Sequence, residues 1–166
     1  MLGGWQRLSF EMNDLYINSS RQMSETKISE KTNDEYDLFP LEVYSQVVNG
    51  VNYHLLFAGR HFQDKTKIKL FKTTVYKPLG DQPQLSLNDD PVMIEPNQNK
   101  FNDNGIEMKV SNTVSSYLGI NGVLKVDKYF NDVYGNGCNV YTVVTEKGTA
   151  VVYETNGEFK VDAVMN

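Results

Sequence analysis

The sequence predicts an α+β protein built from two small units, each with one helix followed by antiparallel strands. A stretch without Gly or Pro, residues 9–32, has helical periodicity, and the residues after it are β-rich with an Asn-Gly pair in their middle. The same order of elements recurs after residue 105. A chain of 166 residues with 40% hydrophobic residues can bury the cores of one ordinary domain or two small ones.

The first helix is expected within residues 9–32, which are rich in Glu, Lys, Met, Gln and Ser. Ser9 or Asn13 could cap its start, and Asn33 could end it. Ile28 is off the expected apolar stripe. The apolar residues that recur at spacings of three and four, and that we expect to face a sheet, are Leu8, Met12, Leu15, Tyr16 and Met23.

A β-hairpin is expected next, because residues 41–48 and 51–58 are β-rich and flank Asn49-Gly50. Asn-Gly between two such runs favours a two-residue type I′ turn, which needs positive φ at both central residues. The remaining strands of this half are expected at 66–76 and 84–87, on either side of turn residues 77–81.

The second half is separated by residues 89–105, which are rich in Asn, Asp and Pro and are expected to be a linker. We therefore divide the chain into a domain at 1–88, the linker, and a module at 106–166. A helix is expected at 106–118. Strands are expected at 123–134, 138–145, 149–155 and 158–164, with turns at Asn136-Gly137, Lys147-Gly148 and Asn156-Gly157.

Composition and charge exclude several classes of function. The net charge is −5 with a pI near 5.0, so nucleic acid is not expected as a partner. No apolar run approaches the roughly 20 residues that span a bilayer, so no membrane partner is expected. The residues Met1–Trp5 have no signal-peptide pattern, which favours a cytoplasmic protein; a secreted form that has lost its signal peptide is the alternative.

Several segments resemble the cystatins, reversible inhibitors of papain-type cysteine proteases. Gln46-Val47-Val48-Asn49-Gly50 is similar to the Gln-Val-Val-Ala-Gly hairpin of that family, with Asn in place of Ala. Residues 29–36 resemble the helix end of the stefins, the small intracellular cystatins, and residues 82–87 resemble their final strand. Met1–Gly4 looks like the short N-terminal trunk of the family. The resemblance covers roughly residues 1–90.

This resemblance implies a cystatin fold, in which a long helix packs on an antiparallel sheet, and tight reversible inhibition of papain-family proteases. The inhibitor would fill the active-site cleft with three segments and offer no peptide bond in attack geometry, so neither enzyme activity, a cofactor nor a metal is expected. Leu2 would fill the pocket before the cleavage point, and a glycine would pass the catalytic thiol. The residues implied in protease binding are Leu2, Gly3, Gly4, Gln46, Val47, Val48, Asn49, Gly50, Pro78, Leu79 and Gly80.

Four alternatives stay open. The chain could be a non-inhibitory interaction module that keeps this fold. Asn33 stands where some cystatins bind legumain, an asparagine-specific protease, but it could equally cap the helix. Cys138 could act with His54 or His61 as a nucleophile, although nothing near it in the sequence lowers its pKa. Residues 106–166 resemble the degenerate second copy of long plant cystatins.

The protein is expected to be a monomer or a hairpin-exchanged dimer.

Overall fold

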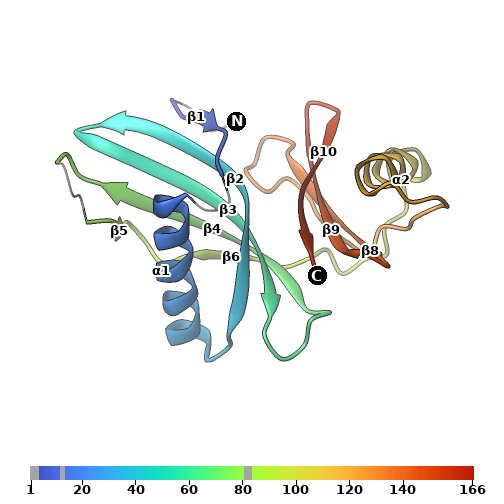
Figure 1. The fold of residues 1–166 in the computed structure, drawn as a ribbon, viewed down its shortest axis with the longest axis horizontal. Coiled ribbons are helices and arrows are strands. Elements are labelled where there is room, and N and C mark those ends of the chain that lie inside the picture. Colours follow the sequence, from blue (N-terminus) through green and yellow to red (C-terminus); the bar gives the residue numbers. More distant parts are fainter. Residues whose placement is uncertain (1–3, 12–13, 81–83) are drawn as a thin grey trace. The chain divides into compact units, whose positions relative to one another are not determined.

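The computed structural model describes residues 4–11, 14–80 and 84–166 and divides the chain into two α+β units (Figure 1). The first unit ends at Ile94, and the second runs from Glu95 to Asn166. Each unit combines one helix with an antiparallel sheet, as the sequence predicts. No helix in the described residues is both long and apolar enough to cross a membrane.

Helix α1 is shorter than expected and uses a different face. It spans Leu15–Thr32, and Asp14 caps it by accepting hydrogen bonds from the backbone N–H groups of Tyr16 and Ile17. Ser9 does not cap the helix, because Asp14 does; Asn13, the other expected cap, lies outside the described residues. The expected stripe is also wrong, since Leu15 is 74% exposed. The residues buried on α1 are Ile17, Ser20, Ser24 and Ile28; Met12 lies outside the described residues.

Small side chains bring α1 close to its sheet. Ser24 Oγ donates a hydrogen bond to the Ser20 carbonyl and lies 3.2 Å from Thr73 Oγ1 on the sheet. The buried hydroxyls are therefore satisfied where the two layers meet. Around them, Ile17 and Ile28 of the helix belong to one core with residues of the sheet: Tyr36, Leu38, Val43, Leu55, Phe57, Phe71 and Val75.

The sheet of the first unit has the order β1-β2-β3-β4-β5, all antiparallel, and β6 also pairs with β4. Figure 1 shows α1 across one face of this sheet. The long central strands begin earlier or end later than the sequence patterns indicate. The strands are β1 (Gln6–Leu8), β2 (Tyr36–Val48), β3 (Gly50–His61), β4 (Ile68–Lys77), β5 (Ser86–Leu87) and β6 (Val92–Ile94).

The expected linker contributes a strand to this sheet. Val92, Met93 and Ile94 of β6 pair with Lys72, Phe71 and Leu70 of β4. Residues after the boundary belong to the second unit, where Phe101 packs edge-on against Tyr129 and Tyr141. Residues 89–105 are thus divided between the two units, with the boundary between Ile94 and Glu95.

The second unit is a helix followed by a four-stranded meander. Helix α2 spans Asn104–Leu118, capped by Asp103, and the sheet order is β10-β9-β8-β7. The strands are β7 (Lys128–Phe130), β8 (Asn139–Thr145), β9 (Gly148–Thr155) and β10 (Glu158–Met165). The core that α2 forms with this sheet contains Val110, Val114, Tyr141, Val143, Ala150, Val152 and Val161.

Two turn predictions for the second unit have different outcomes. Asn156 and Gly157 have φ of 52° and 77°, which confirms the turn between β9 and β10. The prediction of a hairpin turn at Asn136-Gly137 is wrong. Of the strand expected at 123–134, only the short β7 forms, and a longer loop joins it to β8. This loop is closed by Asp132, whose Oδ1 accepts a hydrogen bond from Gly137 N.

Candidate functional site

The tip of the β2–β3 hairpin is apolar, exposed and braced from a third strand. Val47 is 83% exposed and Val48 is 45% exposed. The Tyr76 hydroxyl on β4 donates a hydrogen bond to the Asn49 carbonyl at the tip. The tip is therefore held to β4 while its two valines face solvent.

Gly50 allows this arrangement in two ways. Its φ is +113°, a conformation that side-chain-bearing residues rarely adopt. A Cβ built on Gly50 would lie 2.5 Å from the Lys77 carbonyl oxygen and 2.9 Å from the Tyr76 hydroxyl. The expected type I′ turn is wrong, because Asn49 does not have positive φ and Val48 pairs with Gly50 around it. Asn49 alone stands at the tip.

The segment after β4 lies at the same end of the sheet. Val51 pairs with Lys77, the last residue of β4, so Pro78 and Leu79 follow next to the start of β3. Leu79 is 74% exposed, and Gly80 has φ of +137°. The Lys77 side chain extends to α1, where its ammonium lies 4.5 Å from the centre of the Tyr16 ring.

The N-terminal segment approaches this end from the other side. Gln6 pairs with Ser45 in antiparallel register, so Trp5 and Gly4 run beside the last residues of β2. A Cβ built on Gly4 would lie 3.6 Å from Gln46 Nε2, in ordinary contact. Gln46 in turn accepts a weak hydrogen bond from Asn52 on β3, at 3.4 Å. Leu2 and Gly3, two of the implied binding residues, lie outside the described residues.

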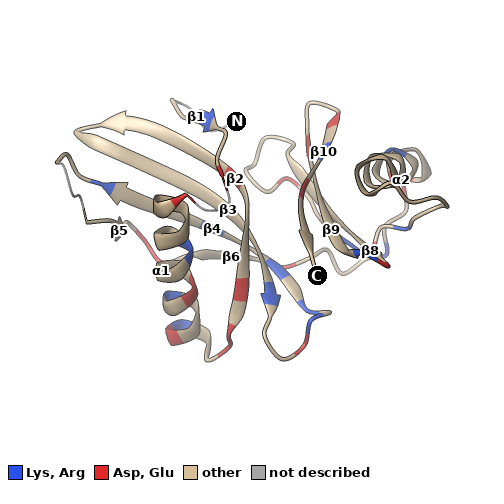
Figure 2. Cartoon of the chain, viewed as in Figure 1, with Lys and Arg blue, Asp and Glu red and all other residues tan. Residues whose placement is uncertain are grey.

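Strand pairing thus brings together the candidate residues that the structure describes, apart from Asn33. They are Gly4, Gln46, Val47, Val48, Asn49, Gly50, Pro78, Leu79 and Gly80. We call this set the apolar edge. No charged residue lies between Val43 and Gly59, so the hairpin side of the apolar edge is uncharged (Figure 2).

Asn33 lies at the opposite end of the sheet. It has φ of 58° and ends α1, with its backbone N–H donating to the Ser29 carbonyl. The neighbouring Asp34 carboxylate lies 3.1 Å from His61 Nε2 at the far end of β3. This hydrogen bond, together with the charge of Lys67, holds the pKa of Asp34 below its usual range. Asn33 is therefore a helix C-cap distant from the apolar edge.

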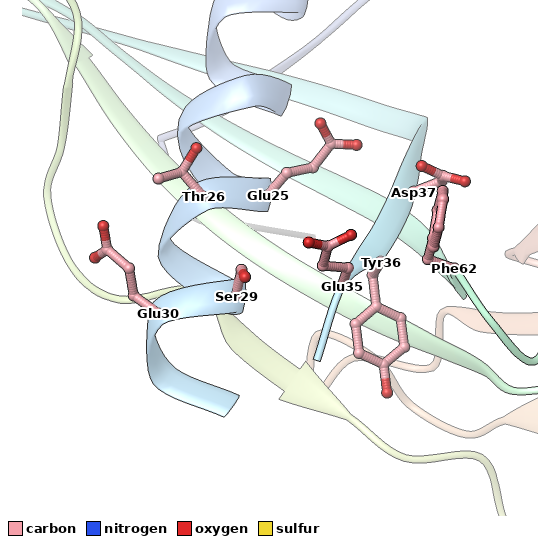
Figure 3. Close-up of a pocket in the computed structure, with 8 residues that line it drawn as sticks. All are labelled: Glu25, Thr26, Ser29, Glu30, Glu35, Tyr36, Asp37 and Phe62. Carbon is pink, nitrogen blue, oxygen red and sulfur yellow. The ribbon is translucent and has the colours of Figure 1, made fainter. Parts of the chain in front are cut away.

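A hollow lies between α1 and the start of β2, with a volume of about 410 Å³ (Figure 3). Glu25 and Glu30 line it from the helix, and Glu35, just before β2, and Asp37, on β2, line it from the other side. Glu25 has a structural role there, because it accepts a hydrogen bond from Leu38 N and pairs with Arg21. It thereby satisfies an N–H group of β2 that strand pairing leaves open. Figure 3 shows the Tyr36 hydroxyl directed away from these carboxylates.

Cys138 and His54, which one alternative pairs as a nucleophile and its base, each lie against a threonine hydroxyl. Cys138 is buried, and its thiol donates to Thr155 Oγ1 at 3.5 Å. His54 Nδ1 lies 3.2 Å from Thr74 Oγ1, and burial, with the nearby charge of Lys72, lowers its pKa to about 4. Across the described ranges, no three His, Cys, Asp or Glu side chains are placed to hold a metal ion.

Two supports of the apolar edge could not be found from the sequence. Tyr76 contacts the hairpin tip from β4, and Trp5 places its ring edge-on to His54 of β3, with centroids 6.0 Å apart. Both contacts depend on strand pairing. The one local signal is that each aromatic residue stands just before or after an implied binding segment.

Comparison with known proteins identifies no relative. No protein-family model matches this chain, and neither the curated proteins nor the solved structures contain a significant match.

Proposed function

We propose that this protein is a reversible inhibitor of papain-family cysteine proteases, and that its first unit has a cystatin fold. The observation that carries this proposal is the apolar edge. Three segments far apart in the sequence, at Gly4, at 46–50 and at 78–80, lie at one end of one sheet. Their exposed aliphatic side chains face outward, where a protease cleft could bury them.

Inhibition by the apolar edge requires only that it fits the protease cleft and buries apolar surface there. The cleft of a papain-type enzyme holds a thiolate, and an inhibitor must occupy it without placing a peptide carbonyl in line for attack. Val47, Val48 and Leu79 would bury aliphatic surface at about 25 cal/mol per Å². The Tyr76 hydrogen bond and the Gly50 turn fix the tip before binding, which limits the entropy lost on association. Gly4 lets the N-terminal backbone pass close to the enzyme.

Titration of active papain tests the proposal. With papain well above the dissociation constant, activity should fall linearly to an end point near one inhibitor per enzyme. No inhibition at micromolar protein would favour a non-inhibitory module and overturn the proposal.

Two aspartate variants locate the surface. Val47→Asp should weaken inhibition about 30-fold or more, because a carboxylate would be buried without a partner. Val123→Asp is the matched control, since Val123 is 84% exposed in the second unit. Equal effects of the two variants would show that the hairpin tip does not contact the enzyme.

A further inference from the structure

The backbone pairing of strand β1 with β2 is by itself a weak link between the N-terminal segment and the sheet. It has three residues, Gln6–Leu8, and all three are exposed. They pair with Val43–Ser45 at the edge of the sheet. Short edge strands with exposed side chains open readily, because few buried contacts are lost when they separate. Some other interaction must keep Gly4 and Trp5 beside the end of β2.

That interaction is an ion pair between Arg7 and a buried carboxylate. Arg7 Nη2 donates to Glu42 Oε2 at 2.9 Å, and Arg7 Nε lies 2.5 Å from Glu42 Oε1. The Glu42 side chain is only 2% exposed, whereas that of Arg7 is 43% exposed. A hydrogen bond between charged groups is stronger than one between neutral groups. Separating it would leave a carboxylate buried in the sheet without this partner.

The position of Glu42 suits this role. It follows a β-bulge between Pro40 and Glu42, where the register of β2 against β3 shifts. Bulges commonly redirect a side chain at a sheet edge. Two residues before Arg7, the Trp5 ring contacts His54, and Gly4 then lies beside Gln46. The chain therefore runs from the Arg7–Glu42 pair directly into the apolar edge.

We propose that Arg7, through its ion pair with Glu42, is the positioning residue that holds Gly4 and Trp5 at the apolar edge. The effect on inhibition rests on the proposed function; the effect on the segment itself does not. Arg7 need not touch the protease. It keeps Gly4 and Trp5 in place before binding, so its loss releases a segment that must then be ordered on the enzyme.

Trp5 gives a direct readout, because it is the chain's one tryptophan. In Arg7→Ala, acrylamide should quench Trp5 fluorescence more strongly, and the amides of β1 should exchange hydrogen faster. Arg7→Lys should lie between Arg7→Ala and the wild type, because lysine keeps the charge but not the planar guanidinium group. Arg21→Ala is the matched control: it removes an arginine that pairs with Glu25 on α1, away from β1. Unchanged quenching in Arg7→Ala would overturn the proposal.

Inhibition of papain is then measured as a double-mutant cycle with the N-terminal segment. In the full chain, Arg7→Ala should lose most of the factor in the dissociation constant that deleting residues 1–4 loses, chiefly through faster dissociation. In the chain that starts at Trp5, Arg7→Ala should change inhibition by less than about twofold, because nothing remains to be positioned. Equal losses in both backgrounds would assign Arg7 a merely structural role.

The design separates three failures. If the wild type does not inhibit papain, the proposed function fails, while the quenching and exchange data still decide the role of Arg7. If Arg7→Ala unfolds, the double variant Arg7→Met/Glu42→Gln removes both charges and should recover stability. That variant should still show the increased quenching of Trp5. Wild-type quenching in a folded double variant would overturn the proposal.

Discussion

At the residue scale, the hairpin tip depends on one glycine that meets a conformational and a steric demand together. Gly50→Ala should place a methyl group 2.5 Å from the Lys77 carbonyl at a φ of +113°. We expect a loss of roughly 2–4 kcal/mol in the free energy of unfolding, the sum of backbone strain and displacement of β4. Urea unfolding followed by circular dichroism measures it.

Gly80→Ala is the control for that substitution. Gly80 also has positive φ, +137°, but a Cβ there would meet nothing within 4 Å. Its cost should therefore be the backbone strain alone, about 1–2 kcal/mol. Equal losses for the two variants would mean that contact with β4 does not determine the need for Gly50.

His54 makes the stability of the fold depend on pH. Burial lowers its pKa from 6.5 to about 4, so the unfolded chain binds a proton that the folded chain does not bind between these values. Stability should therefore fall as pH drops from 6.5 to 4, by up to about 3 kcal/mol. His54→Gln should have a flatter profile over this window in urea unfolding at several pH values. Parallel profiles for variant and wild type would contradict this assignment.

At the element scale, local patterns identified most helices and strands but not their faces or partners. The start of α1 was predicted wrongly because Ser9 and Asn13 are as suitable caps as Asp14. Residues 6–8, including Leu8 of the expected apolar stripe, form a strand that pairs with β2. No local sequence pattern indicates that pairing. The prediction of the buried face of α1 was wrong because Ser20 and Ser24 are polar residues. Their small size and satisfied hydroxyls nevertheless let α1 approach the sheet.

The candidate site residues were implied by a resemblance, and the structure adds where the described ones lie. Residues 46–50 and 78–80 are turn segments, whose composition is visible in the sequence, and antiparallel pairing then places them at one end. Their supports were not predictable. The Tyr76 bond to Asn49 and the Arg7 pair with Glu42 join different strands, so they depend on register rather than on local composition.

At the scale of the whole molecule, the boundary between the units determines which shorter chain keeps an intact sheet. The first unit continues to Ile94, because β6 pairs with Leu70–Lys72 of β4. A chain of residues 1–88 would leave these backbone groups open at a sheet edge, where they can pair with another molecule.

We therefore expect residues 1–94 to be more stable than residues 1–88 by about 1–2 kcal/mol, through the backbone hydrogen bonds of β6. The shorter chain should also associate more at high concentration. Urea unfolding and size-exclusion chromatography of the two chains measure both effects. A 1–94 chain with Gly-Ser-Gly at positions 92–94 is the length-matched control and should resemble 1–88, because glycine and serine form strands poorly. If this control instead matches unaltered 1–94, added length rather than β6 pairing stabilises the sheet.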